Sequence, residues 1–229
     1  NETLTMMIVA KNITKTFGKL KALDDVSITF SPGPCIALLG PNGCGKTTLI
    51  KALLGMVVPD SGTIHFDSES ITGKWMYRSR VGYMPQIGRY PENMTIANVI
   101  DMMKDIRKEN NNSFDDELVK AFGLENMMQK KMRTLSGGTT QKVSAALAFM
   151  FHPDVLILDE PTAGLDPLSS EKLKQKIIAE KQKGKLILIT SHILSELDDL
   201  ITEVFYMQEG TLVFHKKLAA LKEETGEIK

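Results

Sequence analysis

A glycine-rich stretch, GPNGCGKTT at residues 40–48, constrains the fold of this chain more than any other feature. It follows the apolar run CIALLG at 35–40 and precedes Leu49 and Leu53, which recur at helical spacing. The pattern GxxxxGKT between a buried strand and a helix predicts a phosphate-binding loop, because glycines let backbone N–H groups surround phosphate oxygens. A glycine-rich turn without function is the alternative, and this strand and helix context disfavours it.

The residues of this loop have distinct expected roles. Lys46 is expected to reach the outer phosphates of a nucleotide, and the Thr47 hydroxyl is expected to ligate Mg²⁺. The other residues are expected to contact the nucleotide through the loop backbone or the first turn of the helix. The full set of predicted loop contacts is Gly40, Pro41, Asn42, Gly43, Cys44, Gly45, Lys46, Thr47 and Thr48.

Two further apolar runs, VLIL at 155–158 and LILI at 186–189, predict parallel strands that helices cover on both faces. Asp159 and Glu160 follow the first run, and His192 lies just beyond the second. Ligands bind at the carboxyl ends of the strands in an open α/β sheet. We therefore expect these side chains and the glycine loop to converge on one crevice.

The two adjacent carboxylates suit different tasks. Asp159 is suited to hold Mg²⁺ directly or through water, and Glu160 is a candidate general base for an attacking water molecule. A pair of carboxylates at a solvated strand end, with no chemical role, is the alternative. The glycine loop in the same chain favours the chemical role.

The remaining sequence predicts how the domain is organised. The first 33 residues alternate polar and apolar positions, as half-solvated antiparallel strands do. Residues 87–134 are helix-forming, and VFYMQEGTLVFH predicts a hairpin that turns at Glu209 and Gly210. A short charged helix is expected from Lys216 onward.

These elements define an α/β fold. We expect a mostly parallel core sheet with helices, an antiparallel β-subdomain and an inserted α-helical subdomain. The chain is expected to form a single domain, 1–229, because 229 residues suffice for one large core but not for two full domains. Residues 1–86 and 135–229 would form the core with its β-subdomain, and 87–134 the helical subdomain.

Composition excludes some classes of partner. Lys and Arg total 28 and Asp and Glu total 28, so the basic footprint of a dedicated nucleic-acid binder is missing. The two cysteines, Cys35 and Cys44, suit a reducing compartment. Apolar runs fall short of the roughly 20 residues that a bilayer span needs. A membrane role is therefore expected to depend on a partner protein.

A second glycine-containing turn occurs in TLSGGTTQK at 134–142. Ser136 is placed to cap a helix, and Gly137 and Gly138 would allow an anion to approach the backbone closely. The predicted helix carries an apolar stripe at helical spacing. An ordinary capped helix is the alternative for this turn taken alone. The stripe consists of Val143, Ala146, Leu147 and Met150.

The order of the motifs resembles the ATP-binding subunit of ABC transporters along essentially the whole chain. The glycine loop is followed by GYMPQ, which ends at Gln86, and then by the helical insertion. LSGG, LDEPT, AGLD and TSH come next, as they do in that family. These four motifs occupy 135–138, 158–162, 163–166 and 190–192.

The resemblance implies roles that the residues alone do not establish. It implies that Phe17 stacks on adenine, that Gln86 senses the γ-phosphate, metal and water, and that His192 contacts the γ-phosphate. Without it, a core aromatic residue and a structural histidine remain the alternatives for Phe17 and His192. Asp166 would cap a helix ahead of Pro167, and in the family its loop also crosses to the partner subunit.

The resemblance also implies how such a protein works. The cofactors would be ATP and Mg²⁺, and the partners a second copy of the chain and an integral membrane permease. ATP-driven pairing would place Ser136, Gly137 and Gly138 on the nucleotide of the other chain. The protein would be cytoplasmic and peripheral on the inner face of the membrane. An ATP-dependent conformational switch that signals to a membrane partner without transport is the alternative.

One departure from the family pattern and two further local features complete this interpretation. The usual signature continues as LSGGQ, whereas Thr139 stands here and Gln appears only at 141. GRYPENMT and LSGGTTQK are similar to ATPases of exporter-like systems, including those in nitrous-oxide-reductase copper maturation. The Lys-rich segment 172–185 predicts a solvated helix face.

Methionines gather in and beside the helical insertion. They suit either an adaptable docking surface or helix packing, and copper binding is the remote alternative. Seven of the chain's 13 methionines fall within 84–132, namely Met84, Met94, Met102, Met103, Met127, Met128 and Met132.

Overall fold

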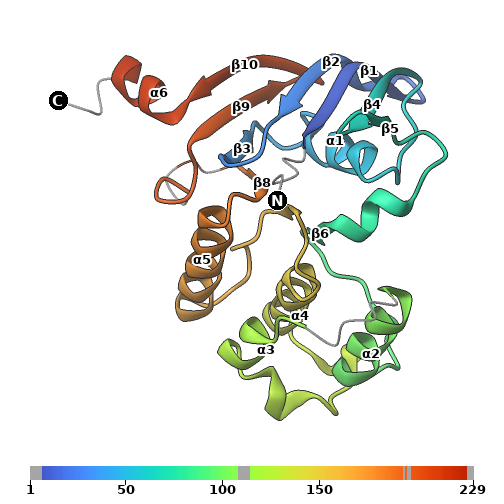
Figure 1. Cartoon of the computed structure of the whole chain (residues 1–229), viewed down its shortest axis with the longest axis vertical. Coiled ribbons are helices and arrows are strands. Elements are labelled where there is room, and N and C mark those ends of the chain that lie inside the picture. The colour runs from blue at the N-terminus through green and yellow to red at the C-terminus, as the bar shows by residue number, and fades with distance from the viewer. Residues whose placement is uncertain (1–6, 108–113, 193, 195–196, 226–229) are drawn as a thin grey trace. The chain divides into compact units, whose positions relative to one another are not determined.

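The computed structural model describes residues 7–107, 114–192, 194 and 197–225 (Figure 1). The chain divides into two compact units. Unit 1 comprises Asn1–Arg78 and Lys181–Lys229, and unit 2 comprises Ser79–Glu180. The glycine loop therefore belongs to unit 1, whereas Asp159 and Glu160 belong to unit 2.

An antiparallel sheet forms the first part of unit 1. Its strand order is β2-β1-β4-β5, and Ile8 of β1 lies opposite both Phe30 of β2 and Phe66 of β4. Apolar side chains such as Ile28 and Phe30 alternate with exposed positions along β2. The predicted antiparallel strands are confirmed. The strands are β1 Ile8–Phe17, β2 Leu20–Phe30, β4 Ser61–Phe66 and β5 Glu69–Ser70.

The second group of strands in unit 1 follows the order β10-β9-β3-β8. β3 is parallel to both β8 and β9, and every residue of β3 is buried, as its apolar sequence predicts. The predicted hairpin joins β9 and β10, where Glu209 and Gly210 both have positive φ, 47° and 79°. These strands are β3 Cys35–Leu39, β8 Leu186–Ser191, β9 Glu203–Gln208 and β10 Thr211–Lys217.

Two helices complete unit 1. Helix α1, Lys46–Leu53, follows the glycine loop and contacts β2. It stops before Gly55, whose φ of 64° is left-handed and whose N–H donates to the Ala52 carbonyl at 2.9 Å. Helix α6, Leu218–Thr225, follows β10 and matches the expected C-terminal helix.

Unit 2 contains a parallel strand pair and most of the helices. β6 pairs with β7, and α4 contacts β6, α2 and α3, which lie close together in Figure 1. Residues 87–134 fall within this unit, although 108–113 lie outside the described residues. The elements of unit 2 are β6 Val81–Met84, α2 Ile96–Arg107, α3 Glu117–Ala121, α4 Gly137–Phe149, β7 Val155–Asp159 and the start of α5 Pro167–Gln182, with 3-10 turns at Leu124–Met127 and Met132–Thr134. A further 3-10 turn, Met76–Arg80, spans the division between the two units.

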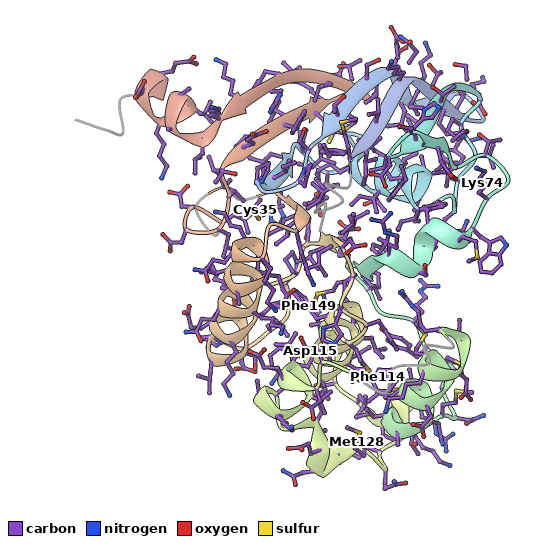
Figure 2. All side chains as sticks on the ribbon, in the orientation of Figure 1. Cys35, Lys74, Phe114, Asp115, Met128 and Phe149 are labelled. Carbon is purple, nitrogen blue, oxygen red and sulfur yellow. The ribbon has the colours of Figure 1, made fainter. Side chains whose placement is uncertain are left out.

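The predicted solvated face of 172–185 is wrong at Lys176. Its side chain is 2% exposed, and its ammonium lies 2.5 Å from Asp115 and 2.6 Å from Glu117. Burial lowers the pKa of Lys176, but the two carboxylates outweigh burial and hold that pKa above its usual value. This group ties α5 to the beginning of α3. Asp115, which is labelled in Figure 2, also donates its N–H to the Met150 carbonyl.

The methionines of this region divide between the core and the surface. Met84 ends β6 and Met132 begins a 3-10 turn, and both are buried in the core. Met94 and Met102 instead line an open hollow on unit 2. In the part of the chain that the structure describes, no helix is both long and apolar enough to span a bilayer.

Candidate functional site

Two glycines of the phosphate loop, Gly40 and Gly45, are required by the packing of unit 1 itself. A Cβ at Gly40, where φ is 149°, would lie 2.2 Å from the Met207 carbonyl oxygen. A Cβ at Gly45, where φ is 109°, would lie 2.5 Å from the Ala22 carbonyl oxygen. Only glycine fits so close to another backbone. The loop is thus packed tightly against the hairpin and β2 of the same chain.

Lys46 is held inside this loop. Its ammonium donates to the Gly40 carbonyl at 2.6 Å and to the Pro41 carbonyl at 3.1 Å, and the residue is 7% exposed. Thr47, beside it, is exposed. Helix α1 begins with Lys46. The Lys46 ammonium therefore adds to the positive charge that the helix dipole places at the N-terminus of α1. The loop can bind a phosphate through its backbone N–H groups. The Lys46 ammonium can then leave the two carbonyls and donate to phosphate oxygens instead.

The two other predicted site residues of unit 1 lie at strand ends. Phe17 ends β1 and is 49% exposed, so the alternative of a core aromatic residue is wrong. Lys15 places its ammonium 5.5 Å from the centre of the Phe17 ring. His192 is exposed and directly follows β8. An exposed ring at the position of Phe17 is available for stacking on a base.

The two carboxylates end β7 in unit 2. Asp159 is 3% exposed, so a solvated strand end is wrong for this residue. Burial, and then the negative charge of Asp159, raise the pKa of Tyr83 to about 12. The neutral Tyr83 phenol therefore lies in the electrostatic field of Asp159.

Glu160 has a left-handed backbone conformation and accepts a hydrogen bond from Gln86. Its φ of 49° is left-handed, a conformation that costs free energy in residues other than glycine and clusters at functional sites. The Gln86 amide donates to the Glu160 carboxylate at 3.1 Å. The structure thus brings together the candidate base and the predicted sensor, which are far apart in sequence.

The second glycine turn begins α4. Ser136 is exposed and caps this helix, because its hydroxyl accepts the Thr139 N–H at 3.2 Å. A Cβ at Gly138 would lie 2.7 Å from the Gly164 carbonyl oxygen, so the fold of unit 2 requires that glycine. A Cβ at Gly137 would meet no atom of the described residues within 4 Å. Gly137 thus faces open space.

The helix behind this turn is more buried than its predicted stripe. Ala145, Ala148 and Phe149 are buried together with the stripe positions, because α2, α3 and β6 all contact α4. Gln141 is 4% exposed. Because its side chain is buried, Gln141 does not take the place of the glutamine that the usual signature has at position 139.

Asp166 is held by three bonds within unit 2. Its carboxylate accepts the Ser169 N–H at 2.9 Å and the Ser169 hydroxyl at 2.8 Å, and pairs with the Lys142 ammonium at 2.7 Å. The predicted cap of α5 is confirmed. Lys142 first, and then Ser169, hold the pKa of Asp166 well below its usual value.

The sequence did not reveal every residue that shapes these sites. Lys142 and Gly164 bind the second glycine turn to the AGLD loop, and Tyr90 donates its hydroxyl to Ser144 at 2.9 Å in α4. All these partners are distant in sequence. Only the position of Gly164 inside AGLD gave a signal, because glycine often marks a close backbone approach.

The fold and the loop define a class. A tightly built glycine loop leads from a buried parallel strand into a helix, and buried or strained carboxylates end another such strand, which together characterise a P-loop nucleoside triphosphatase. Comparisons with known proteins narrow this class. The family model described as ABC transporter matches residues 23–163.

Curated relatives agree with the family model. The chain is 35% identical over 204 residues to the Nod factor export ATP-binding protein I of Burkholderia lata, covering 87% of this chain and 67% of that protein. It is 31% identical over 215 residues to the lipopolysaccharide export system ATP-binding protein LptB of Escherichia coli K12, covering 91% and 89%.

Solved structures agree as well. One, titled as the ATP-binding subunit of an ABC transporter, has a TM-score of 0.87 at 26% identity, covering 96% of this chain and 93% of that one. A nucleotide-free ATP-binding cassette has a TM-score of 0.77 at 26% identity, covering 96% and 95%. The chain belongs to the ABC transporter family. It is an ATP-binding and ATP-hydrolysing subunit that drives membrane transport, and the predicted fold class is confirmed.

Proposed function

We propose that this chain forms an ATP-dependent head-to-tail dimer in which each nucleotide is shared between two copies. The observation that carries this proposal is the contrast between the two glycine turns. Gly40 and Gly45 of the first loop pack on their own unit, whereas Ser136 and Gly137 are exposed at the start of α4 and a Cβ at Gly137 would enter open space. A second chain's phosphate is the ligand that this open, capped helix end suits.

Within each shared site, one chain supplies most of the chemistry. Lys46 binds the outer phosphates, Phe17 stacks on adenine and His192 contacts the γ-phosphate. Glu160 takes the proton of the attacking water, and the Gln86 amide that bonds to it keeps the carboxylate oriented. The other chain contributes Ser136, Gly137 and Gly138, with Asp166 in the loop near the dimer contact.

Mg²⁺ fits the oxygen donors that the sequence places in these motifs. We assign the Thr47 hydroxyl, Asp159 and Gln86 as its ligands, directly or through water. Among the described residues no cluster of three or more His, Cys, Asp or Glu side chains could hold a metal. Mg²⁺ with a nucleotide needs no such cluster, since phosphates and water complete its shell. When bound, it neutralises charge on the phosphates.

The membrane partner docks on unit 2 in this proposal. A hollow of about 920 Å³ is lined by apolar and acidic side chains. Ile106 at its edge is 65% exposed. Such a lining fits an apolar segment that carries Lys or Arg, because opposite charges steer and orient association. The residues concerned are Met94, Met102 and Ile106, with Glu92, Asp101 and Asp105.

A short segment connects this hollow to the candidate base. The hollow begins at Pro91, and Tyr90 is fixed to α4 by its hydrogen bond to Ser144. A Cβ at Gly88 would lie 2.2 Å from the Ser144 hydroxyl, so this stretch fits tightly against the helix. Gln86, four residues before Tyr90, bonds to Glu160. Docking at the hollow can therefore affect the orientation of Glu160.

We place the chain on the cytoplasmic face of a membrane, bound through its permease and without nucleic acid as a partner. Both relatives named above are export proteins, which supports export as the direction of transport. The similarity to copper-maturation ATPases stays a sequence-based prediction. A conformational switch without transport is the alternative function.

The test is reconstitution with the membrane protein encoded beside this chain. We expect that protein to stimulate ATP turnover in proteoliposomes and solute flux to follow turnover. The double variant Asp101→Lys with Asp105→Lys should keep the ATPase rate of the free chain and lose the stimulation. Glu223→Lys on the exposed part of α6 is the control for a charge reversal elsewhere on the surface and should behave as wild type.

The outcomes separate the proposals. Stimulated turnover without any solute flux would favour the conformational switch. Full stimulation of the Asp101 and Asp105 double variant would contradict docking at this hollow.

A further inference from the structure

Thr139, where this chain departs from the usual signature, makes two contacts with the Ser136 hydroxyl. The Thr139 N–H donates to the Ser136 oxygen at 3.2 Å. The Thr139 hydroxyl oxygen lies 2.9 Å from the same atom, at hydrogen-bonding distance. Both groups of Thr139 therefore act on one exposed side chain at the start of α4.

The number of hydrogen bonds available to a hydroxyl decides what Ser136 can offer to a ligand. A serine hydroxyl has one O–H donor and two acceptor lone pairs. The Thr139 N–H occupies one lone pair. If the Thr139 hydroxyl donates, it occupies the second lone pair, and only the Ser136 O–H remains for an external group. If Ser136 donates instead, it presents a lone pair, which repels a phosphate oxygen.

We propose that Thr139 is a positioning residue whose hydroxyl donates a hydrogen bond to the Ser136 oxygen and thereby directs the Ser136 O–H toward an anion. The anion is the terminal phosphate of the ATP held by a second copy of the chain, so this inference rests on the proposed function. Thr139 touches no phosphate in this arrangement, and its effect passes entirely through Ser136.

The side chains of Thr140 and Gln141 do not orient the Ser136 hydroxyl. The Thr140 hydroxyl donates to the Ser136 backbone carbonyl at 3.2 Å and not to the Ser136 hydroxyl. Gln141 is 4% exposed, and its amide nitrogen has no hydrogen-bond partner among the described residues. The requirement at position 139 is a side chain that can donate a hydrogen bond to the Ser136 oxygen.

The test uses chains that carry Glu160→Gln, so that ATP-bound dimers accumulate without turnover. Thr139→Val removes the hydroxyl while keeping the size of the side chain and the backbone N–H. Thr139→Ser keeps the hydroxyl. The measurement is the dimer association constant with Mg²⁺ and ATP, from sedimentation velocity over a range of protein concentrations.

We expect Thr139→Val to weaken association by about threefold for each shared site, and hence about tenfold for the dimer, because the neutral hydrogen bond that orients Ser136 is lost while the Ser136 O–H remains. Thr139→Ser should match the parent. ATP affinity of the monomer should not change in either variant. Circular dichroism and thermal unfolding check that α4 remains folded.

A double-mutant cycle separates the inference from the proposed function. In a Ser136→Ala background, Thr139→Val should cost nothing further, because Thr139 acts through Ser136. A further loss there, or an unchanged association constant for Thr139→Val alone, would overturn the positioning role while leaving Ser136 in the shared site. Full association of Ser136→Ala itself would overturn the shared site as well.

Discussion

The two glycine turns of this chain look alike in sequence and differ in structure. In the turn at 40–45, Gly40 and Gly45 lie against carbonyl groups of Met207 and Ala22, and Lys46 is enclosed. In the turn at 136–138, Gly138 lies against Gly164, but Gly137 and Ser136 face outward.

A glycine can be required by the packing of its own fold or by an external ligand. Where an added Cβ would strike the chain's own backbone, the fold alone explains the glycine. Where that Cβ would enter open space and φ is not positive, the fold gives no reason for glycine. Gly137 belongs to this second kind. Unit 1 itself thus explains Gly40 and Gly45, whereas Gly137 is open to an external ligand.

The largest expected effect comes from Lys46→Ala in the enclosed turn. The change removes a charge that the phosphates need, and we expect kcat/KM for ATP to fall by about 10³-fold. Lys51→Ala on the exposed side of α1 is the control and should retain activity. Steady-state phosphate release measures both. Wild-type turnover in Lys46→Ala would remove this turn from the site.

Glu160→Gln should slow hydrolysis by roughly 10²-fold while ATP still binds, because it removes the base but keeps a side chain of the same shape. ATP-bound dimers should then accumulate, which light scattering detects. If this variant stays monomeric at saturating ATP and Mg²⁺, the roles of the base and the dimer cannot both be right.

The two adjacent glycines allow the comparison to be made within one turn. Gly138→Ala should lower the free energy of unfolding by about 1–3 kcal/mol, because the new Cβ meets a carbonyl at 2.7 Å. Gly137→Ala should change it by less than about 0.5 kcal/mol and yet weaken ATP-driven association. Urea unfolding and sedimentation measure the two effects. Equal stability of both variants would contradict the distinction between the glycines.

The smallest effect concerns the loop that contacts Gly138. The pKa of Asp166 is lower in the folded chain than its ordinary value of 3.8, so its ion pair stabilises the fold above about pH 4. That stability is lost as the pH falls below this value toward the folded pKa. The difference in unfolding midpoint between wild type and Asp166→Asn should be constant from about pH 5 to 7 and shrink below pH 4. Lys142→Met should remove most of this pH dependence.

Local patterns in the sequence predicted much of the fold. The continuous apolar runs became parallel strands because burial on both faces demands them, and Glu209 and Gly210 formed the expected turn. Ser136 and Asp166 cap their helices as predicted, because capping depends on neighbours in sequence.

Interactions between distant residues could not be predicted in this way. The burial of Lys176 depends on Asp115 and Glu117, which lie 61 and 59 residues away in the sequence. The ion pair of Lys142 with Asp166 and the bond from Gln86 to Glu160 likewise join separate motifs. A sequence shows which side chains are charged, but it does not show which ones meet.

The most direct test of a shared nucleotide site is to mix two inactive chains. One carries Lys46→Ala, and the other carries Ser136→Arg, which puts a bulky side chain in the phosphate path. If each site uses Lys46 of one chain and Ser136 of the other, the mixed dimer holds both lesions in one site and leaves the second site intact. We predict that mixing restores ATPase activity together with ATP-dependent association of the two chains. If mixing restores neither activity nor association, the two glycine turns do not share a nucleotide across the dimer.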